Sequence, residues 1–133
     1  MKAARNQAGW TLIELMVVMS LIIVLSTIAL AQYKNSIRQT KEAVLKADLF
    51  HMRESIDQYY ADKGSYPSSL QTLVSEGYLR SVPQDPLTKS SDTWVTTQAE
   101  LDPTATSSSP GIYDVKSGAD GVSLDGTRYS DWH

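Results

Sequence analysis

The chain has 133 residues, no cysteine and 41% hydrophobic residues. This length suits one small domain, and the lack of cysteine excludes disulfides, thiolate metal sites and thiol nucleophiles. Twelve basic residues against 15 acidic ones give a formal net charge of −3, which argues against a nucleic-acid partner because such a partner favours a basic surface.

The first predicted element is an apolar helix. From Leu15 to Ala31 there are 17 residues without a charge or a proline, and as an α-helix they span roughly 25 Å, close to the hydrocarbon core of a bilayer. Apolar residues surround this helix on all sides, which suits lipid or a bundle of helices. We expect residues 10–33 to be a transmembrane segment, with Lys2 and Arg5 retaining the N-terminus in the cytoplasm.

Glu14 lies at the edge of this apolar segment, where an unpaired carboxylate costs a few kcal/mol, about 2.5–3.5 on insertion scales. It therefore calls for a cationic partner. Cleavage after Gly9 gives Trp10 a free α-amino group four residues before Glu14. Within one helix that amine leads away from the glutamate, so the amine of a neighbouring copy, shifted along the axis, is the predicted partner.

Two other interpretations of the apolar segment stay open. One is an ordinary secretory signal cleaved near Ala29-Leu30-Ala31, although 17 uncharged residues exceed a typical hydrophobic region of such signals. The other is a plain signal-anchor helix, which leaves Glu14 unexplained.

No proline or glycine occurs from Gln32 to Lys63, so the helix is predicted to continue as one rod to about Asp62 and to stop at Gly64. Its second half carries one apolar stripe at helical spacing, made of Leu45, Leu49, Met52, Ile56 and Tyr59. Opposite charges four residues apart predict an exposed face, with pairs Arg38–Glu42, Glu42–Lys46 and Arg53–Asp57.

Shorter elements are predicted after the long helix. Ser68 or Ser69 is expected to cap a short helix, with Gly77 just beyond its end. Pro83 and Pro86 then exclude helix and central strand.

Two or three short antiparallel strands are predicted toward the C-terminus, at Trp94–Val95, Ile112–Val115 and Arg128–Tyr129. The residues Thr104–Ser109 are expected to form a flexible loop, and Ser117–Gly121 a turn. Packed on the long helix, these strands complete an α+β domain over residues 34–133.

The order of Gly9, Trp10, Thr11-Leu12-Ile13-Glu14 and a long apolar helix resembles the class III leader of type IV pilins and type II secretion pseudopilins. The resemblance implies that residues 1–9 are a leader, that a prepilin peptidase cuts after Gly9 and methylates Trp10, and that Glu14 pairs with a neighbour's amine during filament assembly. Trp10 stands where the family usually has Phe, and Ala31 where many members carry a helix-kinking proline.

The stretches Gly64-Ser65-Tyr66-Pro67, Gly77-Tyr78-Leu79 and Pro83-Gln84-Asp85-Pro86 are similar to the region after the long helix in major pseudopilins of type II secretion. The resemblance implies a pilin-like α+β fold, with a long N-terminal helix, a small C-terminal antiparallel sheet and long loops. A type IV pilus subunit for adhesion or motility is the alternative, but those pilins usually end in a disulfide-closed loop that this chain cannot form.

Four aspartates lie among glycines near the C-terminus, at Asp114, Asp120, Asp125 and Asp131. Carboxylates and loop carbonyls are the ligands that Ca²⁺ prefers, whereas aspartate and glycine also build ordinary turns. Both interpretations stay open from the residues alone.

The stretch from Asp114 to Gly121 is similar to the calcium loop of major pseudopilins, which implies Asp114 and Asp120 as ligands of a structural Ca²⁺. The family's serine ligand is replaced by Val122. The missing oxygen is expected from Ser123, Asp125 or the Gly111 carbonyl.

The resemblance implies a mechanical role and no enzymatic activity. His51 and His133 are the only histidines, and neither belongs to a catalytic motif. We expect a precursor in the bacterial inner membrane with its C-terminal domain in the periplasm, which polymerises into a homopolymeric pseudopilus and helps export folded proteins across the outer membrane. The implied partners are a prepilin peptidase, minor pseudopilins and the inner-membrane secretion platform. A monomeric, signal-anchored calcium-binding module is the alternative from another class.

Overall fold

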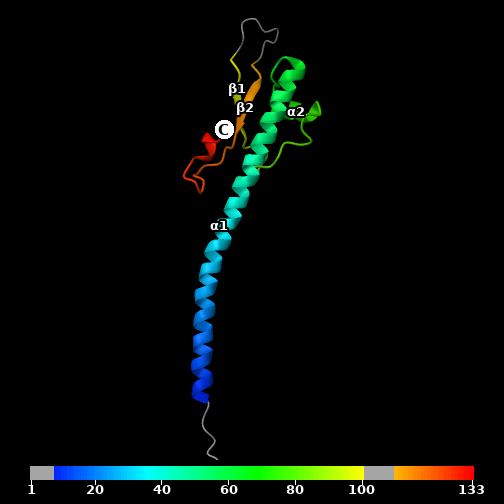
Figure 1. Ribbon diagram of the computed structural model, residues 1–133. Coiled ribbons are helices and arrows are strands. Elements are labelled where there is room, and N and C mark those ends of the chain that lie inside the picture. Colours follow the sequence, from blue (N-terminus) through cyan, green and yellow to red (C-terminus); the bar gives the residue numbers. More distant parts are fainter. Residues whose placement is uncertain (1–7, 101–109) are drawn as a thin grey trace, which may run out of the picture. The chain divides into compact units, whose positions relative to one another are not determined.

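The computed structural model describes residues 8–100 and 110–133, with side chains from Thr11 onward. The predicted leader, except for the backbone of its last two residues, and the predicted loop Thr104–Ser109 lie outside the described residues. Along the chain the elements are α1 (Ala8–Lys63), α2 (Leu70–Ser75), β1 (Val95–Gln98), β2 (Ile112–Lys116) and the 3-10 helix η1 (Tyr129–Asp131) (Figure 1). The chain divides into two compact units, residues 1–37 and 38–133.

The helix α1 is continuous and ends where the sequence predicts. Gly64 has a φ of 68°, a left-handed conformation that glycine adopts without a steric penalty. Its N–H donates to the Tyr60 carbonyl at 2.8 Å, which closes the last turn. Lys63 in that turn forms an ion pair with Glu76 at 3.1 Å.

The core of the second unit lies along one face of α1. Leu45, Leu49, Met52 and Ile56 are all buried, with at most 2% exposure, and Tyr59 packs against them at the edge. The predicted apolar stripe is therefore confirmed. The buried partners that cover it are Leu73, Trp94, Ile112, Val115, Ala119, Tyr129 and Trp132.

The short helix α2 also follows the sequence prediction. Of the two predicted caps, Ser69 accepts a hydrogen bond from the Thr72 N–H at 3.2 Å. Gly77 follows the helix with a φ of 83°, and the Tyr78 N–H returns to the Leu73 carbonyl at 2.8 Å. This closure turns Leu73 into the core.

The sheet has two antiparallel strands, which lie beside the part of α1 in the second unit (Figure 1). Val95 pairs with Lys116 and Gln98 with Ile112, with an irregularity between Thr97 and Gln98. The strands predicted at Trp94–Val95 and Ile112–Val115 are therefore present, each shifted by a residue or less at its start.

The last predicted strand is wrong. Arg128 forms a single isolated bridge with Val122, and Tyr129 begins the helix η1. A tight turn between Val122 and Arg128 closes too soon for a ladder to extend.

Candidate functional site

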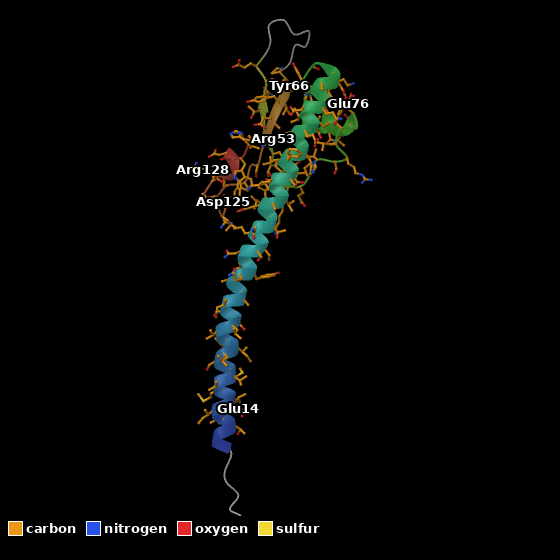
Figure 2. All side chains as sticks on the ribbon, in the orientation of Figure 1. Glu14, Arg53, Tyr66, Glu76, Asp125 and Arg128 are labelled. Atoms are coloured by element: carbon orange, nitrogen blue, oxygen red, sulfur yellow. The ribbon has the colours of Figure 1, made fainter. Side chains whose placement is uncertain are left out.

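The first candidate is the uncovered first half of α1 (Figure 2). From Thr11 to Thr40 every side chain is exposed, and α1 is the one helix of the described chain long and apolar enough to cross a membrane. The hydroxyls of Ser20 and Thr27 donate to carbonyls of their own helix, each at 2.7 Å. Such internal pairing is what a helix needs in lipid, where no water can satisfy polar groups.

Glu14 projects from this apolar surface and is exposed (Figure 2). The backbones of Gly9 and Trp10 lie in the first turns of α1, while their side chains lie outside the described part of the chain. The predicted pair between Glu14 and a neighbour's amine joins two copies, so it stays a prediction.

The second candidate is a compact turn near the C-terminus. The Ser123 N–H donates to the Thr127 carbonyl at 2.7 Å, and the Gly126 N–H donates back to the Ser123 carbonyl at 3.0 Å. The Ser123 and Thr127 hydroxyls lie 2.9 Å apart, and the Trp132 indole N–H donates to Thr127 Oγ1 at 2.9 Å. The residues from Ser123 to Trp132 thus fold upon themselves.

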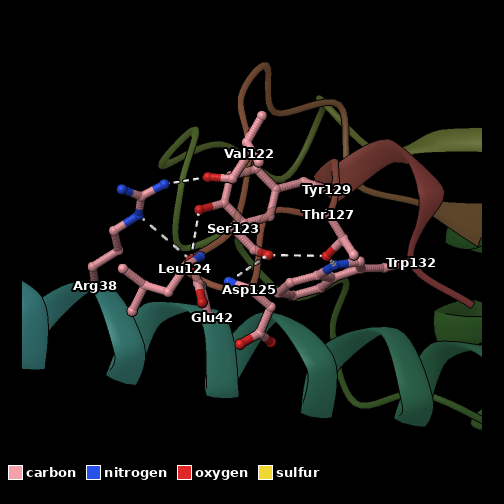
Figure 3. A network of polar contacts seen from close by, with 9 residues as sticks. All are labelled: Arg38, Glu42, Val122, Ser123, Leu124, Asp125, Thr127, Tyr129 and Trp132. Carbon is pink, nitrogen blue, oxygen red and sulfur yellow. Dashed lines mark hydrogen bonds and ion pairs between the residues drawn. The ribbon is translucent and has the colours of Figure 1, made fainter.

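Glu42 of α1 fastens this turn to the helix (Figure 3). It is buried, at 7% exposure, and its Oε1 accepts from the Leu124 N–H at 3.0 Å and from the Tyr129 hydroxyl at 2.8 Å. Arg38 lies 3.5 Å from the same oxygen and also donates to the Val122 carbonyl. Burial and the contact with Glu42 raise the pKa of Tyr129, against the opposing effect of Arg38, and the hydroxyl therefore stays a donor.

Arg53 is a second anchor between α1 and the C-terminal region. Its Nε donates to Asp114 Oδ1 at 2.8 Å, and its Nη2 donates to the carbonyls of Val115 and Trp132, both at 2.8 Å. Lys46 lies over the Trp132 ring, 4.6 Å from its centroid. These contacts correct the predicted pair of Arg53 with Asp57.

Asp85 is a buried anchor that the sequence does not predict. The prolines at positions 83 and 86 predict only that this stretch is neither helix nor central strand. Asp85 is fully buried, and it accepts from the Leu87 N–H at 2.8 Å and from the Ser117 hydroxyl at 2.5 Å. Ser117 in turn accepts from the Ala119 N–H at 3.1 Å. The predicted turn at Ser117–Gly121 is therefore tied to the Asp85 carboxylate through the Ser117 hydroxyl.

The predicted calcium ligands are not brought together. Among residues 8–100 and 110–133, no three acidic, histidine or cysteine side chains are placed to hold one metal ion. Asp120 lines a hollow with Arg128, whereas Asp125 lines a different hollow with Lys46 and Arg53. Basic residues therefore line both hollows, which disfavours a bound cation.

The other predicted ligands are engaged by protein groups. Asp114 accepts from Arg53 and from the Val115 N–H at 2.8 Å. Ser123 closes its turn with Thr127, and the Gly111 carbonyl accepts from the Ala99 N–H at 2.8 Å. The residues present therefore do not fit a shared calcium ion, and calcium binding remains a prediction.

Comparisons with known proteins point to one family. Residues 4–30 match the family model described as the prokaryotic N-terminal methylation motif. The type II secretion system core protein G of Pseudomonas aeruginosa is 32% identical over 62% of this chain and 69% of its own length. The proteins of the same name from Klebsiella pneumoniae and Escherichia coli are 30% and 28% identical, over 70% of their lengths. No solved structure gave a significant match.

Proposed function

The chain belongs to the family of type II secretion system core protein G, and we propose that it is the subunit of a periplasmic pseudopilus that helps drive folded proteins across the outer membrane. Its role is mechanical, with no catalytic step. The subunit first rests in the inner membrane through α1, with residues 34–133 in the periplasm.

The observation that carries this proposal is the uncovered apolar half of α1, none of whose membrane-length stretch is buried. An aliphatic side chain left in water forfeits about 1.5–3 kcal/mol of burial free energy, so this surface needs lipid or protein around it. Lipid tails are as apolar as leucine, so packing between neighbouring helices has to hold the subunit once it leaves the bilayer. A helical filament of identical subunits offers such packing along its whole length.

The N-terminal motif supplies a specific contact for that packing. A prepilin peptidase cuts between Gly9 and Trp10 and methylates the new terminus, and the amine of Trp10 then meets Glu14 of a neighbouring subunit. A carboxylate in a low-dielectric environment is costly alone and favourable when paired with an ammonium. The match to the methylation motif over residues 4–30 supports this step.

The remaining partners follow from the same role. Minor pseudopilins and the inner-membrane secretion platform are the components on which such a filament is built, and they meet the subunit at the membrane. The net charge of −3 argues against a nucleic-acid partner, because such a partner favours a basic surface.

The test compares Glu14→Gln and Glu14→Ala with Glu54→Gln, an exposed glutamate of the same helix. Both Glu14 variants are expected to be inserted and processed but to give few or no filaments by electron microscopy of overproducing cells. Glu54→Gln is expected to assemble as wild type. Normal filaments from the Glu14 variants would exclude the proposed pairing.

The mass of the purified protein tests the processing step. We expect a chain that begins at Trp10 and carries one additional methyl group. A chain that begins at Met1 would instead support the monomeric, signal-anchored alternative.

A deletion strain separates the two filament classes. Loss of surface pili with normal protein secretion in that strain would support the type IV pilus alternative.

A further inference from the structure

The C-terminal turn is attached to α1 through one buried oxygen. Glu42 Oε1 accepts the Leu124 N–H at 3.0 Å and the Tyr129 hydroxyl at 2.8 Å, and the Arg38 guanidinium lies 3.5 Å away. The donors converge on this oxygen from the loop and from the preceding turn of the helix (Figure 3). Through Glu42, the helix contacts Leu124 and Tyr129, which follow it in the chain by 82 and 87 positions.

The charge at the middle of this cluster of contacts has the opposite sign to the charge at the middle of a calcium site. A bound calcium ion gathers carbonyl and carboxylate oxygens around a positive charge. Here a negative charge gathers an N–H, an O–H and a guanidinium, and charge-assisted hydrogen bonds of this kind are the stronger class. Arg38 also donates to the Val122 carbonyl, an oxygen that would otherwise be free to coordinate a metal.

The first of the predicted metal ligands is compensated in the same way. Asp114 pairs with Arg53 at 2.8 Å, with both side chains mostly buried, and Asp120 lines a hollow to which Arg128 also contributes. A calcium ion at Asp114 would have to displace its contact with Arg53.

We infer that Glu42 is the fastening site of the C-terminal turn in this chain, and that it takes the place of a bound calcium ion. The site binds a segment of the chain itself, the residues from Val122 to Tyr129. The inference concerns the folding of residues 38–133 and stands apart from the proposed pairing at Glu14.

The experiment measures amide hydrogen exchange of the full-length chain in detergent micelles, using peptides that cover residues 122–132. Wild-type protein is compared in millimolar calcium chloride and in the chelator EGTA. Exchange is expected to be the same in both, because no calcium ion has to hold the turn. Slower exchange in calcium than in EGTA would overturn the inference.

The variants test Glu42 directly. Glu42→Gln is expected to raise the exchange rate of the turn about ten- to a hundredfold, the loss expected when hydrogen bonds to a charged group are weakened. Glu54→Gln is the matched control on the same helix and is expected to exchange as wild type. A wild-type rate in Glu42→Gln would overturn the inference.

A milder variant keeps the test decisive if Glu42→Gln fails to fold. Tyr129→Phe removes one donor and leaves the carboxylate with Leu124 and Arg38. It is expected to raise exchange of the turn about three- to tenfold, while exchange of β1 and β2 stays as in the wild type. No change in the turn would count against the inference. The filament assay on Glu14 is unaffected by either result, so the two proposals can fail separately.

Discussion

Replacing Arg53 by lysine should destabilise residues 38–133. Arg53 donates three hydrogen bonds of 2.8 Å, to Asp114, Val115 and Trp132. Lysine keeps the charge but lacks the planar fork, so its single nitrogen cannot reach acceptors that are spread around a guanidinium. We expect the ion pair with Asp114 to persist and the two carbonyls to lose their donor.

The magnitude follows from the burial of the site. The Arg53 and Asp114 side chains are 22% and 17% exposed, so solvent screens them only in part. Two charge-assisted hydrogen bonds, partly replaced by water, correspond to about 2–3 kcal/mol of unfolding free energy. For a domain of this size the melting midpoint should fall by about 10–20 °C.

The assay is thermal unfolding of the full chain in detergent, followed by near-ultraviolet circular dichroism. The signal reports on Trp94 and Trp132, which are both buried in the core. Arg80→Lys is the control, since Arg80 is exposed, and it should melt with the wild type. A midpoint for Arg53→Lys within about 2 °C of the wild type would refute the assigned role.

Two further predictions concern the loops and the pH range. Gly118→Ala should lower the urea midpoint by the equivalent of about 2–3 kcal/mol, because a Cβ at Gly118 would lie 2.0 Å from the Thr93 carbonyl oxygen; an unchanged midpoint would contradict this close approach. Burial raises the pKa of Tyr129 above its ordinary value of 10.0, so its contribution is complete below that value and is lost as the pH rises through the folded-state pKa. Urea unfolding should therefore show stability falling in alkaline solution, and Tyr129→Phe should show a smaller fall; equal slopes would remove Tyr129 as the cause.

The parts of the fold that depend on neighbouring residues could be predicted from the sequence. The apolar stripe from Leu45 to Ile56 follows the helical period, and Gly64 and Gly77 end their helices because each needs a positive φ. The strand Ile112–Lys116 was also predictable, since its β-branched and aromatic residues favour a strand, and Ile112 and Val115 are buried in the structure.

The anchors of the C-terminal turn could not be predicted, because their partners are distant in the sequence. Charges four residues apart suggested an exposed face, yet Glu42 is buried and Arg53 pairs with a residue 61 positions away. One signal was available: Glu42 precedes Leu45 by three residues and therefore lies on the core stripe. A carboxylate at such a position needs donors from another element, but no local pattern says which one.

The division of labour along α1 has a consequence for how such subunits can diversify. Every buried hydrophobic residue of the described chain lies at or after Leu45, while Glu14 and the uninterrupted exposed apolar stretch from Leu15 to Ala31 precede it. Substitutions in the first half of α1 therefore should not affect the folding of residues 38–133. Substitutions in residues 38–133 should likewise leave the apolar half of the helix unchanged. Related subunits can therefore keep the same helix packing in the filament while the surface of residues 38–133 varies. The reverse is also open to them, with a conserved globular unit on a changed helix packing.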